Sequence, residues 1–220
     1  QDGWPLLASK TQRIDLKNIK PKKDCRYCVR KALSAQCSVL KNDFGGFYKL
    51  WRMAAGIKRL WIPSEKNFWA LINAFGKNCY CITIDDLAGA VVLVHQKIAY
   101  YYYAACLPAG KPLYLPYQVV WECMKEAKKR GCKIWDWEGI YDERWPNKGW
   151  RGFTHFKKSF GGYEVSFPGS FTRWFWRYRR GFWSHNWRSF CRCIWNRSGK
   201  SGRLTQEFAV WQIRAGWKTG

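Results

Sequence analysis

The sequence has no apolar run long enough to cross a lipid bilayer. Its two apolar runs of note, residues 87–94 and 98–107, fall far short of the ~20 residues that a transmembrane helix needs. The pattern therefore does not predict a transmembrane protein.

Acidic residues are scarce as well. Asp and Glu total 15 against 39 Lys and Arg, which gives a formal net charge of +24. A surplus of this size weakens the compact state by self-repulsion and attracts polyanions, so RNA, anionic lipid or a phosphorylated substrate is the expected partner. The hydrophobic fraction of 47% is ordinary for a chain that buries a core, which excludes intrinsic disorder. The length of 220 residues favours one domain, or one domain with an appendage.

Cysteine is below the density of a disulfide scaffold, which favours a reduced, cytosolic protein. The ten cysteines include the pairs Cys25/Cys28 and Cys191/Cys193, which have some likeness to the halves of a zinc site. The pairs lie far apart in the sequence, however, the second has a single spacer, and no His pair accompanies either. Buried or surface thiols are therefore favoured, and no metal site is predicted.

The periodicity of apolar residues predicts five helices in residues 24–169. Asp24 is the expected N-cap of the first, and Ser64 that of the third. Gly131 is expected to end the fourth at its C-cap. The predicted ranges are 25–34, 44–57, 65–75, 117–130 and 153–160.

Alternating and β-rich runs predict strands between these helices. Residues 78–84, 88–95 and 98–106 form a meander, and single strands are expected at 13–16, 133–139 and 163–167. The result is an α/β fold whose mixed, mostly antiparallel central sheet is flanked by helices. This element order is that of the GNAT acyltransferase fold. Residues 1–23 are expected to be a basic lead-in segment, residues 24–169 a single domain, and residues 170–220 an appendage.

The appendage differs from the domain in composition. Residues 170–220 contain 11 Lys or Arg, seven Trp and one acidic residue, Glu207. Three interpretations stay open: a helix whose aromatic side packs on the domain, a segment that lies on an anionic membrane surface, and a segment whose aromatic rings stack on RNA bases.

Two segments resemble the Fem aminoacyltransferases. These are Asp136-Trp-Glu-Gly-Ile140 and Gly152-Phe-Thr-His-Phe-Lys-Lys-Ser-Phe-Gly-Gly162, and the resemblance extends over about residues 12–170. It implies a GNAT-like enzyme that moves an amino acid from aminoacyl-tRNA to an amine of a peptidoglycan precursor peptide, carried by lipid II or its nucleotide precursor. It also implies a cytoplasmic protein, peripheral on the inner face of the membrane. Longer family members have two such domains, so a second subunit in place of the other domain is a candidate partner.

The resemblance assigns Lys157 to the position of a lysine that stabilises the tetrahedral transition state. Phe156 is grouped with the substrate-binding residues, with packing beneath Lys157 as its favoured role. Arg26, Arg30 and Lys31 are similar to the basic helix that opens the family's domain and are placed to hold phosphate, with a solvated helix face as the alternative.

Two further pairs are candidates. Asp136 and Glu138 are expected on one face of their strand, where a carboxylate could orient or deprotonate the amine, and pairing of a carboxylate with a nearby Arg is the safer assumption. Tyr102 and Tyr103 are expected on opposite faces of the meander, so that one of them faces the groove.

Several catalytic signatures are absent from the sequence. Residues 107–115 lack the glycine-rich pattern whose amides hold the pyrophosphate of acyl-CoA, so no cofactor is predicted beyond aminoacyl-tRNA as co-substrate. No nucleophile elbow, His-Glu-x-x-His or Walker loop occurs. The alternatives are a non-catalytic basic module that binds RNA or anionic lipid, and an N-acyltransferase with another donor.

Overall fold

The computed structural model describes residues 8–144 and 148–168. The predicted appendage, Cys191 and Cys193 lie outside these residues. Within them, no helix is long and apolar enough to cross a membrane.

One seven-stranded sheet organises the described residues. Its spatial order is β2-β3-β4-β5-β6-β1-β7, and the parallel pair in it is β5 with β6, the other neighbours being antiparallel. The first strand comes from the predicted lead-in segment and lies inside the sheet. The strands are β1 (Lys10–Asp15), β2 (Val39–Lys41), β3 (Cys79–Ile84), β4 (Ala88–His95), β5 (Ile98–Cys106), β6 (Ile134–Asp136) and β7 (Tyr163–Ser166).

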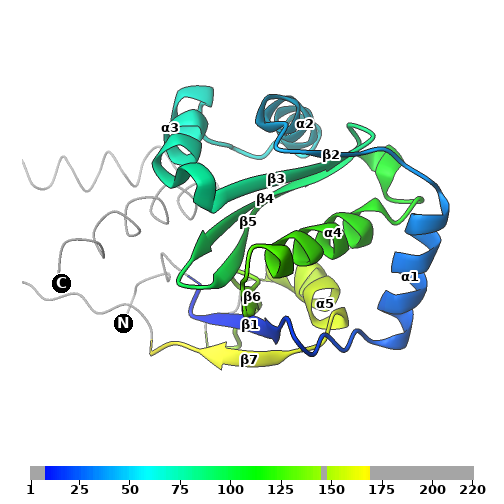
Figure 1. The fold of residues 1–220 in the computed structure, drawn as a ribbon, viewed down its shortest axis with the longest axis vertical. Helices are drawn as coiled ribbons and strands as arrows, with labels where there is room; N and C mark the ends of the chain where they lie inside the picture. The colour runs from blue at the N-terminus through cyan, green and yellow to red at the C-terminus, as the bar shows by residue number, and fades with distance from the viewer. Residues whose placement is uncertain (1–7, 145–147, 169–220) are drawn as a thin grey trace, which may run out of the picture.

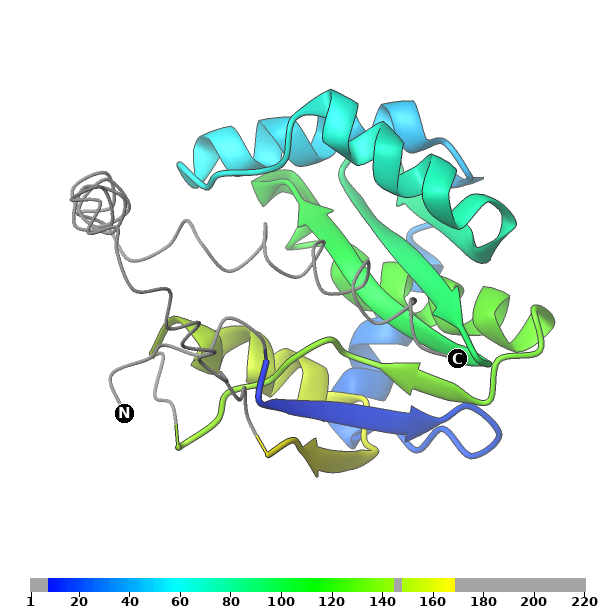
Figure 2. The ribbon, with the colours of Figure 1, turned by 90° about the vertical axis from the view of Figure 1, so that its left-hand side faces the viewer.

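Helices cover both faces of this sheet. The second and third helices pack on one face, and the first, fourth and fifth on the other (Figures 1 and 2). Each face therefore has its own apolar cluster, as expected for a sheet buried on both sides. The helices are α1 (Lys23–Ser34), α2 (Phe44–Ile57), α3 (Glu65–Phe75), α4 (Leu115–Lys129) and α5 (Arg151–Ser159).

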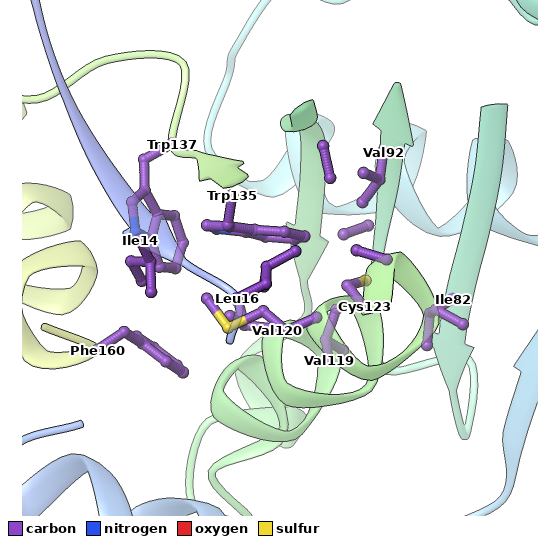
Figure 3. Packing of buried hydrophobic residues seen from close by; sticks show 14 of the residues in the cluster. Ile14, Leu16, Ile82, Val92, Val119, Val120, Cys123, Trp135, Trp137 and Phe160 are labelled. Atoms are coloured by element: carbon purple, nitrogen blue, oxygen red, sulfur yellow. The ribbon is translucent and has the colours of Figure 1, made fainter. Parts of the chain in front are cut away.

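Large aromatic side chains dominate the core beneath α4. Trp135, Trp137 and Phe160 are fully buried, and Figure 3 shows them beside Ile14 of β1. The Trp137 ring centroid lies 5.8 Å from that of Trp135 and 5.3 Å from that of Phe160. Full burial of one such side chain stabilises the fold by about 1.5–3 kcal/mol. These contacts fix β6 against α5, which carries Lys157.

Side-chain caps mark the N-terminal ends of two helices. The side chain of Asp43 caps α2 by accepting from the Gly46 amide at 2.8 Å, and that of Ser64 caps α3 by accepting from the Asn67 amide. The expected N-cap at Asp24 is wrong, because α1 begins earlier, with Lys22 as its N-cap. Asp24 lies in the first turn instead, where a carboxylate is stabilised by the helix dipole.

Two strand predictions also need correction. The strand expected at 133–139 ends at Asp136, because Glu138 takes a left-handed backbone conformation with φ of 64°. The three-residue strand β2 was not expected, since two of its side chains are exposed and it shows no apolar alternation.

Gly162 explains part of the sequence motif that ends α5. Its φ is 96°, and a Cβ there would collide with the carbonyl oxygen of Arg13 on the neighbouring strand β1. Glycine allows both the left-handed backbone and this close approach, so α5 can turn directly into β7.

A buried carboxylate fastens three segments together. Asp142 accepts hydrogen bonds from the Ser9 hydroxyl at 2.5 Å and from Arg144 Nη2 at 2.8 Å. Arg144 Nη2 also donates to the carbonyl oxygens of Ser9 at 3.1 Å and Phe167 at 3.2 Å. The Arg144 guanidinium, followed by the Ser9 hydroxyl, lowers the pKa of Asp142 to about 2.

We expect Asp142→Asn to lower the free energy of unfolding at neutral pH by roughly 1–3 kcal/mol, because Ser9 and Arg144 exchange a charged acceptor with two oxygens for one neutral amide oxygen. A carboxyl with a lowered pKa stabilises the fold above its ordinary pKa of 3.8, and this contribution is lost as pH falls toward about 2. Denaturant titrations of the wild type and the variant should therefore show a difference in the free energy of unfolding that shrinks as the pH falls below 3.8. A difference that stays constant down to about pH 3 would contradict the role of the charged carboxylate.

Candidate active site

The site forms where two parallel strands separate. β5 and β6 pair from Ile98/Ile134 to Tyr100/Asp136. Beyond this point β5 stays paired with β4 alone, up to Cys106. The segment after β6 bonds toward β1 instead: the Trp137 amide donates to the Gln12 carbonyl at 3.1 Å. The separation is visible in Figure 2. Side chains at the carboxyl ends of such strands are free to face a ligand.

Asp136 is buried at the end of β6 and fully engaged. It accepts from the Thr11 hydroxyl at 2.7 Å, from Arg13 Nε at 2.7 Å and from the Glu138 amide at 2.9 Å. The expected pairing of a carboxylate with a nearby Arg is thus present. With its lone pairs directed to these donors, Asp136 is suited to position the segment around Glu138.

Glu138 lies two residues further on, at a strained point of the backbone. Its φ of 64° is uncommon for a residue other than glycine and is held by the surrounding structure. Burial, followed by the negative charge of Asp136, raises the pKa of Glu138 to about 7, while the charge of Lys157 acts in the opposite direction. Near neutral pH this carboxylate can therefore both accept and release a proton.

Lys157 reaches this segment from α5. Its half-buried ammonium donates to the carbonyl oxygens of Trp137 at 2.7 Å and Gly139 at 2.6 Å, and lies 4.7 Å from the centroid of the Phe153 ring. Burial lowers the pKa of Lys157 to about 8, and Glu138 opposes that shift. Since an ammonium has three donors, one N–H remains beyond the two carbonyl bonds.

Gly139 permits this arrangement. A Cβ at this position would lie 2.7 Å from Cβ of Ala8 and 3.2 Å from the Trp150 ring. A side chain at 139 would therefore push the backbone out of the position in which its carbonyl oxygen meets Lys157.

The expectation that Tyr102 and Tyr103 lie on opposite faces of the sheet is wrong. Val91 pairs with Tyr103 and Val92 with Tyr101, so Tyr102 is the extra residue of a β-bulge. A bulge turns two consecutive side chains to the same side, and the two rings lie 4.5 Å apart in the cluster under α2. Burial raises the pKa of both hydroxyls, to about 12 at Tyr103, and the charge of Glu138 adds to both shifts.

Phe156 packs into the core. Its ring centroid lies 4.9 Å from that of Tyr117, 5.4 Å from that of Phe160 and 6.0 Å from that of Trp137. This agrees with the favoured role of packing behind Lys157, and it leaves substrate contact by Phe156 as a prediction.

The three cations of α1 are placed apart from this cluster. Arg26, Arg30 and Lys31 are exposed on α1, whose buried side packs on α4. Arg26 Nη1 donates to the Pro21 carbonyl at 2.8 Å. Within the described residues, no hydrogen bond or ion pair connects them with Lys157 or Glu138, so phosphate binding by α1 stays a prediction.

Of the first cysteine pair, Cys25 is buried and Cys28 is half-buried, and both are free thiols. Burial raises the pKa of the Cys25 thiol to about 11. Across residues 8–144 and 148–168, no group of three or more His, Cys, Asp or Glu side chains is arranged to hold a metal ion.

Sequence reasoning did not identify Thr11 and Arg13 as partners of Asp136, nor the two carbonyl groups that hold Lys157. Backbone acceptors leave no trace in residue identity. Arg13 offered one signal, because it is a charged residue inside a predicted strand and therefore needs a carboxylate partner if that strand is internal.

The family comparison matches the second half of this fold. The model of the FemAB family matches residues 83–175, which include β4, β5, Glu138 and Lys157. A search of curated proteins finds no match.

Solved structures share the fold at low sequence identity. The crystal structure of FemX aligns with a TM-score of 0.64 and 14% identity, over 73% of this chain and 60% of FemX. The C-terminal domain of a lysylphosphatidylglycerol synthetase from Agrobacterium fabrum aligns with a TM-score of 0.55 and 11% identity, over 73% and 57%. L-PGS from Bacillus licheniformis aligns with a TM-score of 0.52 and 9% identity, over 73% of this chain and 58% of L-PGS.

This chain thus spans less than two thirds of each of these structures. The shared fold confirms the predicted GNAT-like class, a mixed, mostly antiparallel sheet between two layers of helices. Together with the match over residues 83–175, it supports the resemblance to the Fem aminoacyltransferases on which the sequence analysis relied.

Proposed function

We propose that this chain transfers an aminoacyl group from aminoacyl-tRNA to an amine of a peptidoglycan precursor peptide. The observation that carries this proposal is the ammonium of Lys157, fixed by two carbonyl oxygens beside Glu138 where β5 and β6 separate. The FemAB match, which includes both residues, supports it. The acceptor is carried by lipid II or by the nucleotide precursor, and the chain works at the cytoplasmic face of the membrane.

The reaction joins an amine to an ester carbonyl. The acceptor nitrogen attacks the carbonyl carbon of the aminoacyl ester, the C–N bond forms, and the C–O bond to the tRNA ribose breaks. Negative charge develops on the carbonyl oxygen in between. The remaining N–H of Lys157 donates a hydrogen bond to this oxygen. The fixed ammonium then stabilises the transition state more than the ground state.

The amine must lose a proton, and the ribose oxygen must gain one. Glu138 is suited to carry this proton, because its raised pKa of about 7 makes it a better base than an ordinary carboxylate and a usable acid afterwards. Asp136 accepts from the Glu138 amide at 2.9 Å, and the proposal gives Tyr102 and Tyr103, whose hydroxyls sense the charge of Glu138, a role in binding substrate. Two anionic substrates also need anchoring, and the proposal gives Arg26, Arg30 and Lys31 that role.

A second acceptor is supported by the structural comparison. One of the similar structures is a domain of a lysylphosphatidylglycerol synthetase by name, which favours a phosphatidylglycerol lipid as the alternative acceptor. The donor and the role of Lys157 would be unchanged. The alignment covers 60% of FemX, and the proposal includes a second subunit or domain that supplies the remaining part for full turnover. Adding a candidate partner domain to the assay tests this part.

The function is tested by incubating the full chain with charged tRNA and one of three acceptors: the nucleotide-linked precursor, lipid II, or vesicles that contain phosphatidylglycerol. We expect the mass of a precursor to rise by one aminoacyl residue. A product on phosphatidylglycerol alone would replace the proposed acceptor, and no product on any acceptor, with or without the partner domain, would contradict the proposed enzyme.

Lys157→Met is expected to reduce transfer by about 100- to 1,000-fold, the loss typical of removing one oxyanion donor. The matched control is Lys158→Met, because Lys158 pairs with Glu164 at the surface. Thermal melting of both variants shows whether lost activity reflects lost structure. Full turnover by a folded Lys157→Met protein would exclude the assigned role.

The pH dependence of transfer should be bell-shaped. The active form needs Glu138 ionised and Lys157 protonated. Because their pKa values are about 7 and about 8, the rate should rise as the pH increases through about 7 and fall above about pH 8. Glu138→Gln should lower kcat by about 100-fold or more and remove the acidic limb of the profile. Glu164→Gln, which alters a surface carboxylate, is the control. An acidic limb that persists in Glu138→Gln would assign the proton transfer to another group.

A further inference from the structure

The most exposed large apolar side chains of the described residues lie together. Ile57 is 62% exposed, Leu60 60% and Met53 54%, at the end of α2 and in the turn toward α3. Met53 and Ile57 are four residues apart on α2 and therefore adjacent on its surface. We call Met53, Ile57 and Leu60 the apolar corner. Grouped exposure of this kind marks an interaction surface more often than isolated exposed residues do.

The backbone holds this corner in place. The Leu60 amide donates to the Ala55 carbonyl at 2.9 Å and the Arg59 amide to the Gly56 carbonyl at 3.1 Å, with Arg59 in the left-handed region at φ 51°. This is the pattern of a Schellman helix end, in which the residue at the Leu60 position usually folds back onto the helix. Here the side chain of Leu60 is directed to solvent instead.

Positively charged residues are close to the apolar corner in the sequence. Residues 44–64 contain no Asp or Glu, and their four cations are all exposed, namely Lys49, Arg52, Lys58 and Arg59. Exposed aliphatic side chains on a segment that also carries exposed cations fit the boundary between lipid headgroups and acyl chains, where the aliphatic groups leave water and the cations bind phosphate. An RNA surface would use the cations and stack on aromatic rings, and it would leave three aliphatic side chains in water.

The apolar corner also lies near the candidate active site. Burial raises the pKa of the Cys106 thiol, and the positive charges of Lys111 and Lys58 oppose that shift, which places Lys58 near the end of β5. Tyr102 precedes Cys106 by four residues on the same strand, or about 13 Å at 3.3 Å per residue. Figure 2 shows the end of α2 and the carboxyl end of β5 on the same side of the molecule.

We propose that the apolar corner docks this chain on an anionic lipid surface and so turns the carboxyl end of β5 toward a lipid-linked acceptor. The docking rests on the exposed side chains alone, whereas its use in catalysis rests on the proposed function. The surface consists of residues within the described range 8–144.

The test measures binding of the full chain to vesicles of phosphatidylcholine, with and without phosphatidylglycerol. The double variant Ile57→Ser/Leu60→Ser should bind anionic vesicles about ten-fold or more weakly, since each inserted aliphatic side chain contributes apolar burial. The matched control is Leu33→Ser/Leu40→Ser, which removes two Leu side chains that are 40% and 45% exposed elsewhere. Lys58→Gln/Arg59→Gln should weaken binding chiefly at low salt.

Unchanged vesicle binding of the Ile57/Leu60 variant would overturn the proposal, as would a wild-type chain that does not bind anionic vesicles. Loss of tRNA binding with vesicle binding intact would assign the corner to RNA instead. A wild-type dimer that the variant converts to a monomer, without a change in vesicle binding, would assign it to a second copy.

Activity separates this proposal from the proposed function. If both hold, the Ile57/Leu60 variant loses transfer to lipid II and keeps transfer to the soluble nucleotide precursor. Equal loss on both acceptors would place the corner in the folded core or the catalytic site and overturn docking. If the wild type transfers to neither acceptor but the variant still loses vesicle binding, the enzyme proposal fails and the docking surface stands.

Discussion

A single ammonium group allows the sheet to open. Where β6 stops pairing with β5, the carbonyl oxygens of Trp137 and Gly139 lose any strand partner, and buried carbonyl groups without a partner are costly. The ammonium of Lys157, on α5, donates hydrogen bonds to these two oxygens at 2.7 and 2.6 Å. The interaction that lets the strands separate is therefore the one that fixes a cation at the point of separation.

Two carboxylates, Asp136 and Glu138, lie near this point in different surroundings. Asp136 is satisfied by a hydroxyl, a guanidinium and an amide, whereas Glu138 is affected mainly by burial and by its neighbour's charge. Pairs of titratable groups in such contrasting environments are typical of acid–base sites. The left-handed backbone of Glu138 has the same origin, because the segment must turn from β6 toward β1 within two residues.

The sequence predicts those helix ends that depend on residues close to them in the chain. The cap at Ser64 and the turn at Gly131 place two helices, since each signal acts within a few residues. The choice of Lys157 came from a family motif. The carbonyl partners of Lys157 and the pairing of Arg13 with Asp136 could not be predicted, because these contacts join segments more than a hundred residues apart or involve backbone atoms common to all residues.

The bulge at Tyr102 could not be predicted for a different reason. Four consecutive tyrosines satisfy an alternating pattern in either register, so the sequence does not specify which face each ring takes. The structure selects a shift between Val91 and Val92, which bends β5 shortly after its pairing with β6 ends at Tyr100. One extra residue thus turns the rings of Tyr102 and Tyr103 to the same face of the sheet, where the charge of Glu138 contributes to raising the pKa of both hydroxyls. A change in the register of β5 would therefore move Tyr102 and Tyr103 as well as the end of the strand at Cys106.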